Sequence, residues 1–273
     1  MKKLAVLIAC MVTLTGLLAG CGGNSTQAPA AGDKKTVVKV GATAVPHAEI
    51  LTALKPALDK EGIELKIVEF TDYVRPNMAL ADKELDANFF QHIPYLEQFS
   101  ADRKLALTYA AAVHIEPMGV YSKKIKNLSE LANGAQIAIP NDPTNGGPAL
   151  SLLAKAGLSK LQDGVGVKGT VKDITDNPKA LVIKELEAPL LPRALDDLAA
   201  AVINTNYALE AKLVPAKDAL FLEPKDSPYA NILAIRKGDE NRPEIQKLAK
   251  VLTSAEAKKF IEDKYKGAVV PAF

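Results

Sequence analysis

Cysteine is scarce in this sequence, and tryptophan is absent. The only two cysteines, Cys10 and Cys21, lie within the first 21 of the 273 residues. The rest of the chain therefore offers no disulfide, no thiol nucleophile and no cysteine-based metal site. This excludes cysteine-dependent enzymes and cysteine-ligated zinc domains from the functions open to the folded part of the chain.

An excess of charge of either sign is also lacking. Residues 1–20 hold two of the 34 lysines and arginines and none of the 32 acidic residues, so the remaining chain is balanced in charge. Without a positive excess the chain has no strong electrostatic attraction for nucleic acid, and we expect no nucleic-acid partner. With 48% apolar residues, most of the chain is expected to fold rather than stay disordered.

Catalytic motifs are missing as well. The sequence has no GxSxG, HExxH or phosphate-loop motif. The stretch Gly164–Gly169 matches GxGxxG, but it follows a polar stretch predicted to be helical, Leu158–Asp163, and no long helix comes after it. A dinucleotide-binding loop needs a strand before it and a helix after it, so we interpret the stretch as a turn. We expect a protein that is not an enzyme and uses no cofactor.

The histidines do not form a pattern typical of a metal site. His92 and His114 are two of the three histidines, and Glu116 follows His114 by two residues. No further acidic residue or cysteine accompanies them at the spacing of metal ligands, so we expect no metal.

The N-terminal segment has the features of an export signal. Lys2 and Lys3 precede the apolar stretch Leu4–Gly20, which is slightly shorter than the roughly 20 residues of a membrane helix. Its end, Leu18–Cys21, looks like a bacterial lipobox, in which Cys21 becomes the lipidated first residue. The alternative is an ordinary signal peptide with an incidental cysteine. We expect residues 1–20 to be a lipoprotein signal peptide.

The segment after the signal is rich in Gly, Ala, Ser and Pro. Residues 21–36 cannot bury a core, and we expect them to form a flexible tether. Several acyl chains on Cys21 would hold the folded part stably at a membrane surface. The expected location is the cell envelope, anchored by lipid on the extracytoplasmic face.

From Val37 onward, short β-rich runs alternate with amphipathic helical patterns. Strands are expected at Val37–Ala42, Ile63–Phe70, Ala87–Phe90, Leu105–His114, Met118–Tyr121, Ala135–Pro140, Leu181–Leu186, Ala199–Ile203 and Asn231–Arg236. Helices are expected near Pro46–Lys60, Val74–Lys83, Ile93–Arg103, Ala149–Ala156, Arg242–Leu252 and Ala255–Lys266. This alternation predicts an α/β fold, and the length suggests two lobes with a ligand cleft at the carboxyl ends of strands.

Aromatic residues cluster where predicted elements end. Six of the 14 Phe and Tyr residues fall within residues 70–99. Four side chains there combine an apolar body with element-end positions and form a candidate apolar slot with polar tips: Tyr73, Phe90, His92 and Tyr95. The alternative is a plain core cluster, which is the role that we expect for Phe70, Phe89 and Phe99.

The loop Asn141–Gly147 follows a predicted strand and leads into a helix. It is either a plain helix start capped by Thr144 or Asn145, or a site whose free N–H groups hold a carboxylate or phosphate. The sequence leaves both possibilities open.

Several segments in a fixed order carry a family resemblance. Besides the lipobox, they are Phe70–Val74, Asp86–His92, Tyr121–Ile125, Pro140–Asn145, Leu191–Asp197 and Ala201–Thr205. Together they resemble the methionine-binding lipoproteins, which are the substrate-binding subunits of methionine ABC importers. The resemblance covers nearly the whole mature chain. It implies a two-lobed periplasmic-binding-protein fold of type II, with lobe one at residues 37–114 plus 224–273 and lobe two at residues 115–223.

The resemblance also implies the ligand site and the partners. The methionine side chain would lie in the slot of Tyr73, Phe90, His92 and Tyr95, with His114 nearby. The polar anchors of the amino-acid head would be Asn145, Asn204 and Asn231. The ligand would be L- or D-methionine or a small methionine-containing peptide. An ABC permease with its ATPase would recognise the ligand-closed state, and we expect the binding protein to be a monomer.

One position departs from the family pattern. The family places an arginine, which grips the ligand carboxylate, where this chain has Pro148. Helix-start N–H groups alone, or Arg75, would have to replace it, or the ligand is not a free amino acid. The departure leaves open a different small ligand, or a surface lipoprotein of the same fold that has lost transport and acts in adhesion or signalling.

Overall fold

The computed structural model describes residues 35–224 and 229–273. The predicted signal peptide, the predicted lipidation site Cys21 and nearly all of the predicted tether lie outside the described residues. Among the helices in the described ranges, none is long and apolar enough to span a bilayer.

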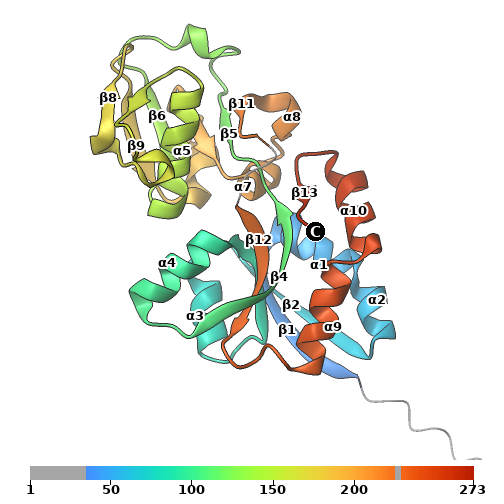
Figure 1. The fold of residues 1–273 in the computed structure, drawn as a ribbon. Coiled ribbons are helices and arrows are strands. Elements are labelled where there is room, and N and C mark those ends of the chain that lie inside the picture. The colour runs from blue at the N-terminus through green and yellow to red at the C-terminus, as the bar shows by residue number, and fades with distance from the viewer. Residues whose placement is uncertain (1–34, 225–228) are drawn as a thin grey trace, which may run out of the picture. The chain divides into compact units, whose positions relative to one another are not determined.

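Strands and helices alternate along the described chain, as Figure 1 shows by colour from blue to red. The strands are β1 (Thr36–Thr43), β2 (Ile63–Phe70), β3 (Ala87–His92), β4 (Leu107–Ile115), β5 (Gly119–Tyr121), β6 (Gln136–Pro140), β7 (Lys160–Leu161), β8 (Ile174–Asp176), β9 (Val182–Leu186), β10 (Ala200–Ile203), β11 (Ala219–Leu222), β12 (Ala230–Arg236) and β13 (Val270–Pro271). The helices are α1 (Glu49–Ala53), α2 (Lys55–Lys60), α3 (Arg75–Ala81), α4 (Ile93–Arg103), α5 (Pro143–Lys155), α6 (Leu191–Ala194), α7 (Thr205–Glu210), α8 (Pro215–Asp218), α9 (Pro243–Leu252) and α10 (Ala255–Tyr265). Short helical turns lie at η1 (Ala44–Ala48), η2 (Leu128–Glu130), η3 (Gly166–Lys168), η4 (Val171–Asp173) and η5 (Ala188–Leu190).

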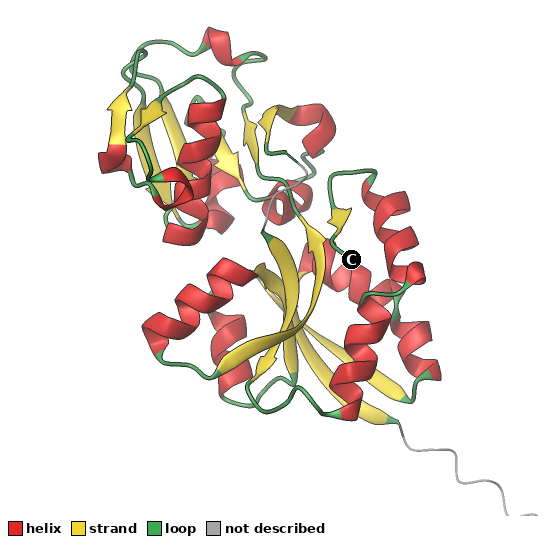
Figure 2. Cartoon of the chain, in the orientation of Figure 1, coloured by secondary structure: helices red, strands yellow, loops and turns green. Residues whose placement is uncertain are grey.

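Six strands form the sheet that we call the first sheet, in the order β13-β4-β12-β3-β1-β2. β1 runs parallel to β2 and β3, whereas β12 runs antiparallel to β3 and β4. Helices α3 and α4 cover one face, and α1, α2, α9 and α10 cover the other (Figures 1 and 2). The central strands β1, β3 and β12 are therefore largely buried, which explains their apolar runs.

The edge strand β2 shows how the sequence encodes this sheet. Ile63 and Leu65 are buried, while Glu64 and Lys66 between them are exposed. This alternation is the period of a strand with one face toward a core, and charged residues on an edge discourage pairing with other chains. The strand predicted at Ile63–Phe70 is confirmed, residue for residue.

Five strands form the second sheet, in the order β11-β5-β10-β6-β9. The central strand β10 is fully buried. Apolar side chains of α5 pack on one face, and those of α6 and α7 pack on the other. The chain passes from the first sheet to the second between Ile115 and Gly119, and it returns between Leu222 and Ala230.

The single helix expected at Pro46–Lys60 is wrong. The chain forms the short turn η1 and then two helices, α1 and α2, which are separated at Leu54. Pro56 explains this break, because proline has no N–H to donate to the carbonyl of Thr52 one turn earlier. The helical tendency expected at Leu158–Asp163 is also wrong, since β7 there pairs with β8.

The GxGxxG stretch is a turn, as predicted. Gly164 and Gly166 have φ angles of +83° and +51°, which residues with side chains rarely adopt. The turn packs closely on α5, because a Cβ added to Gly147 would lie 2.0 Å from the carbonyl oxygen of Val167. Gly147 therefore permits α5 to approach the turn.

Candidate functional site

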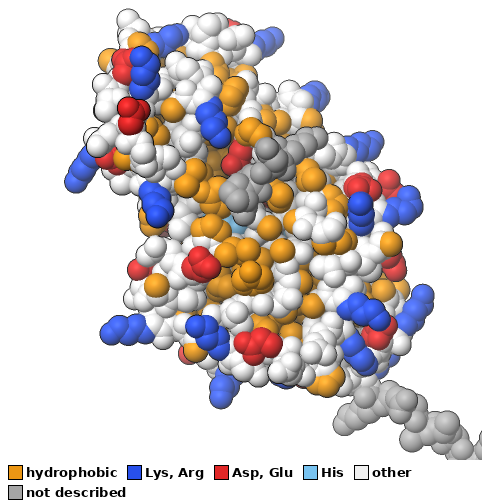
Figure 3. All heavy atoms as spheres, viewed as in Figure 1, with side chains coloured by type: hydrophobic (Ala, Val, Ile, Leu, Met, Phe, Trp, Pro, Cys, Tyr) orange, Lys and Arg blue, Asp and Glu red, His pale blue; other side chains and the backbone are white. Residues whose placement is uncertain are grey.

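A pocket lies among elements of both sheets. Its lining residues are Tyr73, Phe90, Gln91, His92, Tyr95, Glu116, Met118, Thr144, Asn145, Pro148, Asn204, Thr205, Asn206, Glu223, Tyr229 and Asn231. Seven of the eight ligand-binding residues predicted from the sequence are among them, and His114 is not. Figure 3 shows hydrophobic side chains gathered around a hollow in the middle of one face, with a histidine visible inside it.

One side of the pocket is an aromatic wall made of Tyr73, Phe90, His92 and Tyr95. The ring centroids of Tyr73 and Phe90 lie 5.8 Å apart, and those of Phe90 and Tyr95 lie 6.1 Å apart. The Tyr95 hydroxyl donates to the backbone oxygen of Tyr73 at 3.0 Å, which holds the Tyr95 ring in place. Such offset and edge-on contacts give a rigid apolar surface.

Three hydrogen bonds join the aromatic side to helices of the second sheet. The Tyr73 hydroxyl donates to Asn206 Oδ1 at 2.6 Å. His92 Nε2 lies 3.2 Å from Asn145 Oδ1. The Tyr207 hydroxyl donates to the backbone oxygen of Thr71 at 3.2 Å. The pocket is thus bounded on both sides by groups that also contact one another.

The start of α5 is capped by Asp142, so the caps expected at Thr144 or Asn145 are wrong. The Asp142 carboxylate accepts from the backbone N–H of Asn145 at 3.0 Å and from the Thr144 hydroxyl at 2.9 Å. Asp142 has the extended backbone of a capping residue, and Pro143 follows at the first helical position. The Asp142 carboxylate therefore already accepts from the Asn145 N–H, which is one of the groups that the sequence analysis left available for a ligand.

Amide side chains form the opposite side of the pocket. Asn145 Nδ2 donates to both oxygens of Asp142, and Asn145 Oδ1 accepts from Asn204 Nδ2 at 2.7 Å. Asn204 Oδ1 and Asn206 Nδ2 are buried without a hydrogen-bond partner in the part of the chain that the structure describes. Because an unsatisfied buried polar atom costs about 1–3 kcal/mol, this acceptor and donor are natural contacts for a ligand.

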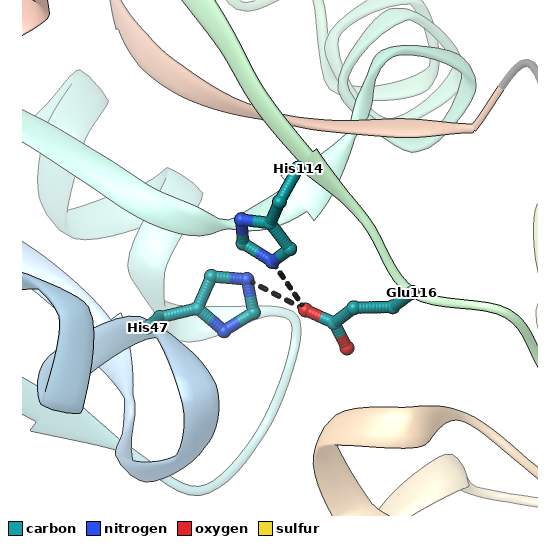
Figure 4. Close-up of side chains that lie close together, drawn as sticks. All are labelled: His47, His114 and Glu116. Carbon is teal, nitrogen blue, oxygen red and sulfur yellow. Dashed lines mark hydrogen bonds and ion pairs between the residues drawn. The ribbon is translucent and has the colours of Figure 1, made fainter. Parts of the chain in front are cut away.

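Behind the pocket, a carboxylate lies between two buried imidazoles (Figure 4). Glu116 Oε1 is 2.7 Å from His114 Nε2 and 3.2 Å from His47 Nε2. His47 Nδ1 is 2.7 Å from the Thr43 hydroxyl, and its Nε2 also lies 3.2 Å from Asn231 Oδ1. We call His47, His114 and Glu116 the buried cluster.

The buried cluster contains donor atoms of the kind that bind metals, all within 4.8 Å of one another. These atoms already satisfy each other, since both imidazoles hydrogen bond to one carboxylate oxygen. Among the described residues, His114 Nδ1 has no hydrogen-bond partner. The pair considered from the sequence, His92 and His114, does not come together: His92 faces Asn145, whereas His114 lies in the cluster.

Burial sets the charge of the cluster. It lowers the pKa of His47 to about 4 and that of His114 to about 3, and it raises the pKa of Glu116 to about 6. At pH 7 both imidazoles are neutral and the carboxylate is mainly ionised. Their contacts are therefore hydrogen bonds to an anion, and Glu116 brings negative charge to the pocket wall.

Among the described lining residues, two carry carboxylates, Glu116 and Glu223, and none is a lysine or arginine. Burial lowers the pKa of His92, so this imidazole is neutral at pH 7. Arg75 does not line the pocket: it is exposed, and its guanidinium lies 5.7 Å from the centre of the Phe70 ring.

Sequence reasoning missed several lining residues. Asn206 was visible in the Asn204–Asn206 run after a strand, but nothing distinguished it from an ordinary helix start. Glu116 drew attention only as a weak metal candidate, because its partner His47 is far away in the sequence. No sequence pattern pointed to Glu223 or Tyr229 as pocket residues. The eight predicted residues are placed as described, and their contact with a ligand stays a prediction.

Comparison with known proteins places the chain among bacterial binding lipoproteins. A Bacillus subtilis protein named methionine-binding lipoprotein MetQ is 46% identical over 276 residues, covering 99% of both chains. A nutrient-binding protein from Burkholderia cenocepacia, solved bound to methionine, is 48% identical with a TM-score of 0.83, covering 86% of this chain and all of that one.

A periplasmic substrate-binding protein of an ABC transporter from Coxiella burnetii is 42% identical, with a TM-score of 0.82 and the same coverage of the two chains. These likenesses confirm the expected two-lobed α/β binding-protein fold. Residues 38–273 match the family described as NlpA lipoprotein. The match spans nearly the whole folded chain and agrees with the resemblance seen in the sequence, so the chain belongs to the NlpA lipoprotein family.

Proposed function

We propose that this chain is a lipid-anchored solute-binding protein that binds methionine, or a small methionine-containing ligand, for an ABC importer. The observation that carries the proposal is the pocket, in which an aromatic wall faces a set of amide side chains. The names of the relatives point the same way.

The two sides of the pocket suit the two ends of such a ligand. A thioether is apolar and polarisable, and it makes favourable contacts with ring edges such as those of Phe90 and Tyr95. In this proposal the unpartnered Asn204 Oδ1 and Asn206 Nδ2 meet polar atoms of the head, which supports a polar ligand end at the amides.

Ligand binding would change the arrangement of the two lobes relative to each other. We take lobe one as residues 37–114 plus 224–273 and lobe two as residues 115–223, hinged at the two crossings between the sheets. A ligand that contacts the aromatic wall and the amides at once favours the closed arrangement, because only that arrangement offers both sets of contacts. The permease and its ATPase would recognise this state.

Calorimetry tests the binding proposal. The full-length chain in detergent should bind L-methionine, D-methionine or glycyl-methionine at or below millimolar concentration. Phe90→Ala should weaken binding at least tenfold, because it removes part of the aromatic wall. Phe260→Ala, on α10 away from the pocket, should leave binding unchanged. Absence of heat with all three ligands would reject the proposal.

Delivery and anchoring need separate experiments. Replacing Cys21 by Ala should move the protein from the membrane fraction to the soluble fraction. In vesicles, the liganded protein should stimulate ATP hydrolysis by a methionine importer encoded beside it. Ligand binding without any stimulation would instead favour a surface lipoprotein that has lost transport.

A further inference from the structure

The start of α7 is not capped by its own N-cap residue. Asn204 stands at this position with extended backbone, at φ −60° and ψ 139°, but its side chain makes no capping hydrogen bond. Asparagine is preferred at N-caps because its side-chain oxygen ordinarily accepts from a backbone N–H of the first turn. The start of α5 shows that arrangement, since Asp142 accepts from the Asn145 N–H at 3.0 Å. Asn204 therefore has the place and the chemistry of a cap without acting as one.

The side chain of Asn204 makes other contacts. Its Nδ2 donates to Asn145 Oδ1 at 2.7 Å, and the residue lines the pocket. Its Oδ1 is buried without a hydrogen-bond partner in the part of the chain that the structure describes. A buried acceptor without a partner is unfavourable, and an N–H of the first turn of α7 would satisfy it. The oxygen is therefore left unpartnered only because the first turn of α7 is satisfied from elsewhere.

The segment that leads from the first sheet to the second satisfies this turn. The backbone N–H of Asn206, in the first turn of α7, donates to the Glu116 carboxylate. The Thr205 hydroxyl donates to the backbone oxygen of Pro117 at 2.5 Å. Two consecutive residues at the start of α7 are thus held by two consecutive residues of the segment. A negative charge near the start of a helix is also favourable in itself.

Glu116 is fixed in this position from its other side. Its Oε1 lies 2.7 Å from His114 Nε2 and 3.2 Å from His47 Nε2. Its other carboxylate oxygen points away from both imidazoles (Figure 4). Because two buried rings hold the carboxylate, it can in turn hold the start of the helix that donates to it.

We propose that Glu116 is a positioning residue for the ligand. By accepting from the Asn206 N–H, it caps α7 in place of Asn204, and it thereby leaves Asn204 Oδ1 to accept from the protonated amine of the ligand. The inference rests on the proposed function, because it takes the ligand to be methionine or a small methionine-containing ligand with such an amine. Glu116 acts here through Asn204, so its loss should turn Asn204 Oδ1 toward the helix and away from the ligand.

A double-mutant cycle measured by calorimetry with L-methionine tests this role. It uses the full-length chain in detergent at pH 7. Glu116→Ala should lower the affinity at least tenfold, because Asn204 Oδ1 then caps α7, and Asn204→Ala should lower it by a similar factor. In the Asn204→Ala background, Glu116→Ala should lower the affinity less than threefold, because the oxygen through which Glu116 acts is already gone. Glu97→Gln, exposed on α4, is the control and should change the affinity in neither background.

Two results of the cycle would overturn the inference. A tenfold loss from Glu116→Ala in both backgrounds would show that Glu116 contacts the ligand directly instead of acting through Asn204. An unchanged affinity of the Glu116→Ala single variant would show that Glu116 does not position the site at all.

Amide hydrogen exchange of the ligand-free chain tests the change of cap without using methionine. In Glu116→Ala, the protection of the Asn206 and Tyr207 amides taken together should fall less than threefold, because Asn204 takes over as the cap. In the double variant it should fall at least tenfold, because neither cap is left. Equal exchange rates in the single and the double variant would show that Asn204 does not replace Glu116, and the inference would be wrong.

The two experiments separate a failure of this inference from a failure of the proposed function. If methionine binds but the cycle is additive, the proposed function stands and the inference is wrong. If the unchanged chain binds none of L-methionine, D-methionine and glycyl-methionine, the proposed function is wrong, and the exchange rates still decide whether Glu116 caps α7.

Thermal unfolding has to show that Glu116→Ala is folded, since Glu116 lies in the buried cluster. If it is not, Glu116→Gln takes its place in both experiments with the same expected directions. Its single amide oxygen cannot accept from both imidazoles and the Asn206 N–H together.

Discussion

At the scale of single residues, the site depends on partners that are distant in sequence. Asn145 was predicted from its own loop, but its role in holding Asn204 needed the structure. His47 carried no local signal, because its partner Glu116 joins it only after the first sheet has formed. Sequence patterns report which residue types follow a strand, whereas buried polar pairs are decided by tertiary packing.

The buried cluster makes stability depend on pH. His114 has a pKa near 3 in the folded chain, against an unperturbed value of 6.5, so below pH 6.5 the unfolded chain binds a proton that the folded chain does not. Folding stability is therefore lost as the pH falls from 6.5 toward 3, at about 1.4 kcal/mol per pH unit for this proton. His47 acts in the same direction, and Glu116 opposes both between pH 4.5 and 6.

Replacing His114 by Gln removes this titration and keeps an N–H near Glu116. The free energy of unfolding, measured by urea titration between pH 7 and 4.5, should fall less steeply for the variant than for the unchanged chain. Below pH 6.5 the slopes should differ by up to about 1.4 kcal/mol per pH unit. Parallel slopes would show that His114 does not titrate differently in the two states.

At the scale of elements, most strands followed from their apolar patterns, and the errors lie where a local feature overrides the pattern. Pro56 divides a helix that its apolar spacing favours. Asp142 rather than its neighbours caps α5, because both Thr144 and Asn145 are already inside the helix. The short strands β7, β8, β11 and β13 were not predicted, since two to four residues give too little periodicity to identify.

The cap of α5 predicts a measurable loss of stability. Asp142→Ala removes the acceptor for the Asn145 N–H and should lower the free energy of unfolding by about 0.5–2 kcal/mol. It should also weaken methionine binding, because the Asn145 side chain loses both of its carboxylate contacts. Asp163→Ala, in an exposed turn, is the control. Equal denaturation midpoints for the two variants would contradict the capping role.

The close packing of α5 on the turn η3 gives a second prediction. Gly147→Ala would place a methyl group 2.0 Å from the Val167 carbonyl oxygen, so one backbone segment must move. We expect a loss of about 1–3 kcal/mol in unfolding free energy, typical of overpacking. Ser151→Ala on the same helix should change stability by less than about 0.5 kcal/mol. A Gly147→Ala protein as stable as this control would refute the tight contact.

At the scale of the whole molecule, the two-lobed α/β fold was predictable from strand–helix alternation and from the family resemblance. The arrangement of the strands was less accessible. β12, near the C-terminus, lies between β3 and β4. No local sequence pattern predicts such a long-range pairing. The lobe boundaries at 114/115 and 223/224 came from the family resemblance rather than from a local pattern, and they stay a prediction.

The hydrogen bond between Tyr73 and Asn206 links elements of the two sheets. We expect its loss to lower ligand affinity without affecting folding. Tyr73→Phe keeps the ring and removes the hydroxyl that donates to Asn206. The closed arrangement should lose about 0.5–1.5 kcal/mol, so methionine affinity should fall by up to about tenfold. Tyr109→Phe, on an exposed strand position, is the control. Unchanged affinity by calorimetry would show that the bond does not favour closure.

The position of Glu116 in the chain has a mechanical consequence. It is the first residue after β4, on the short segment that leads from the first sheet to the second. In the proposed hinge motion, a group on this segment turns little, whereas the aromatic wall and the amides travel farther. The part of the pocket wall at Glu116 would therefore change least between the open and the closed arrangement of the lobes.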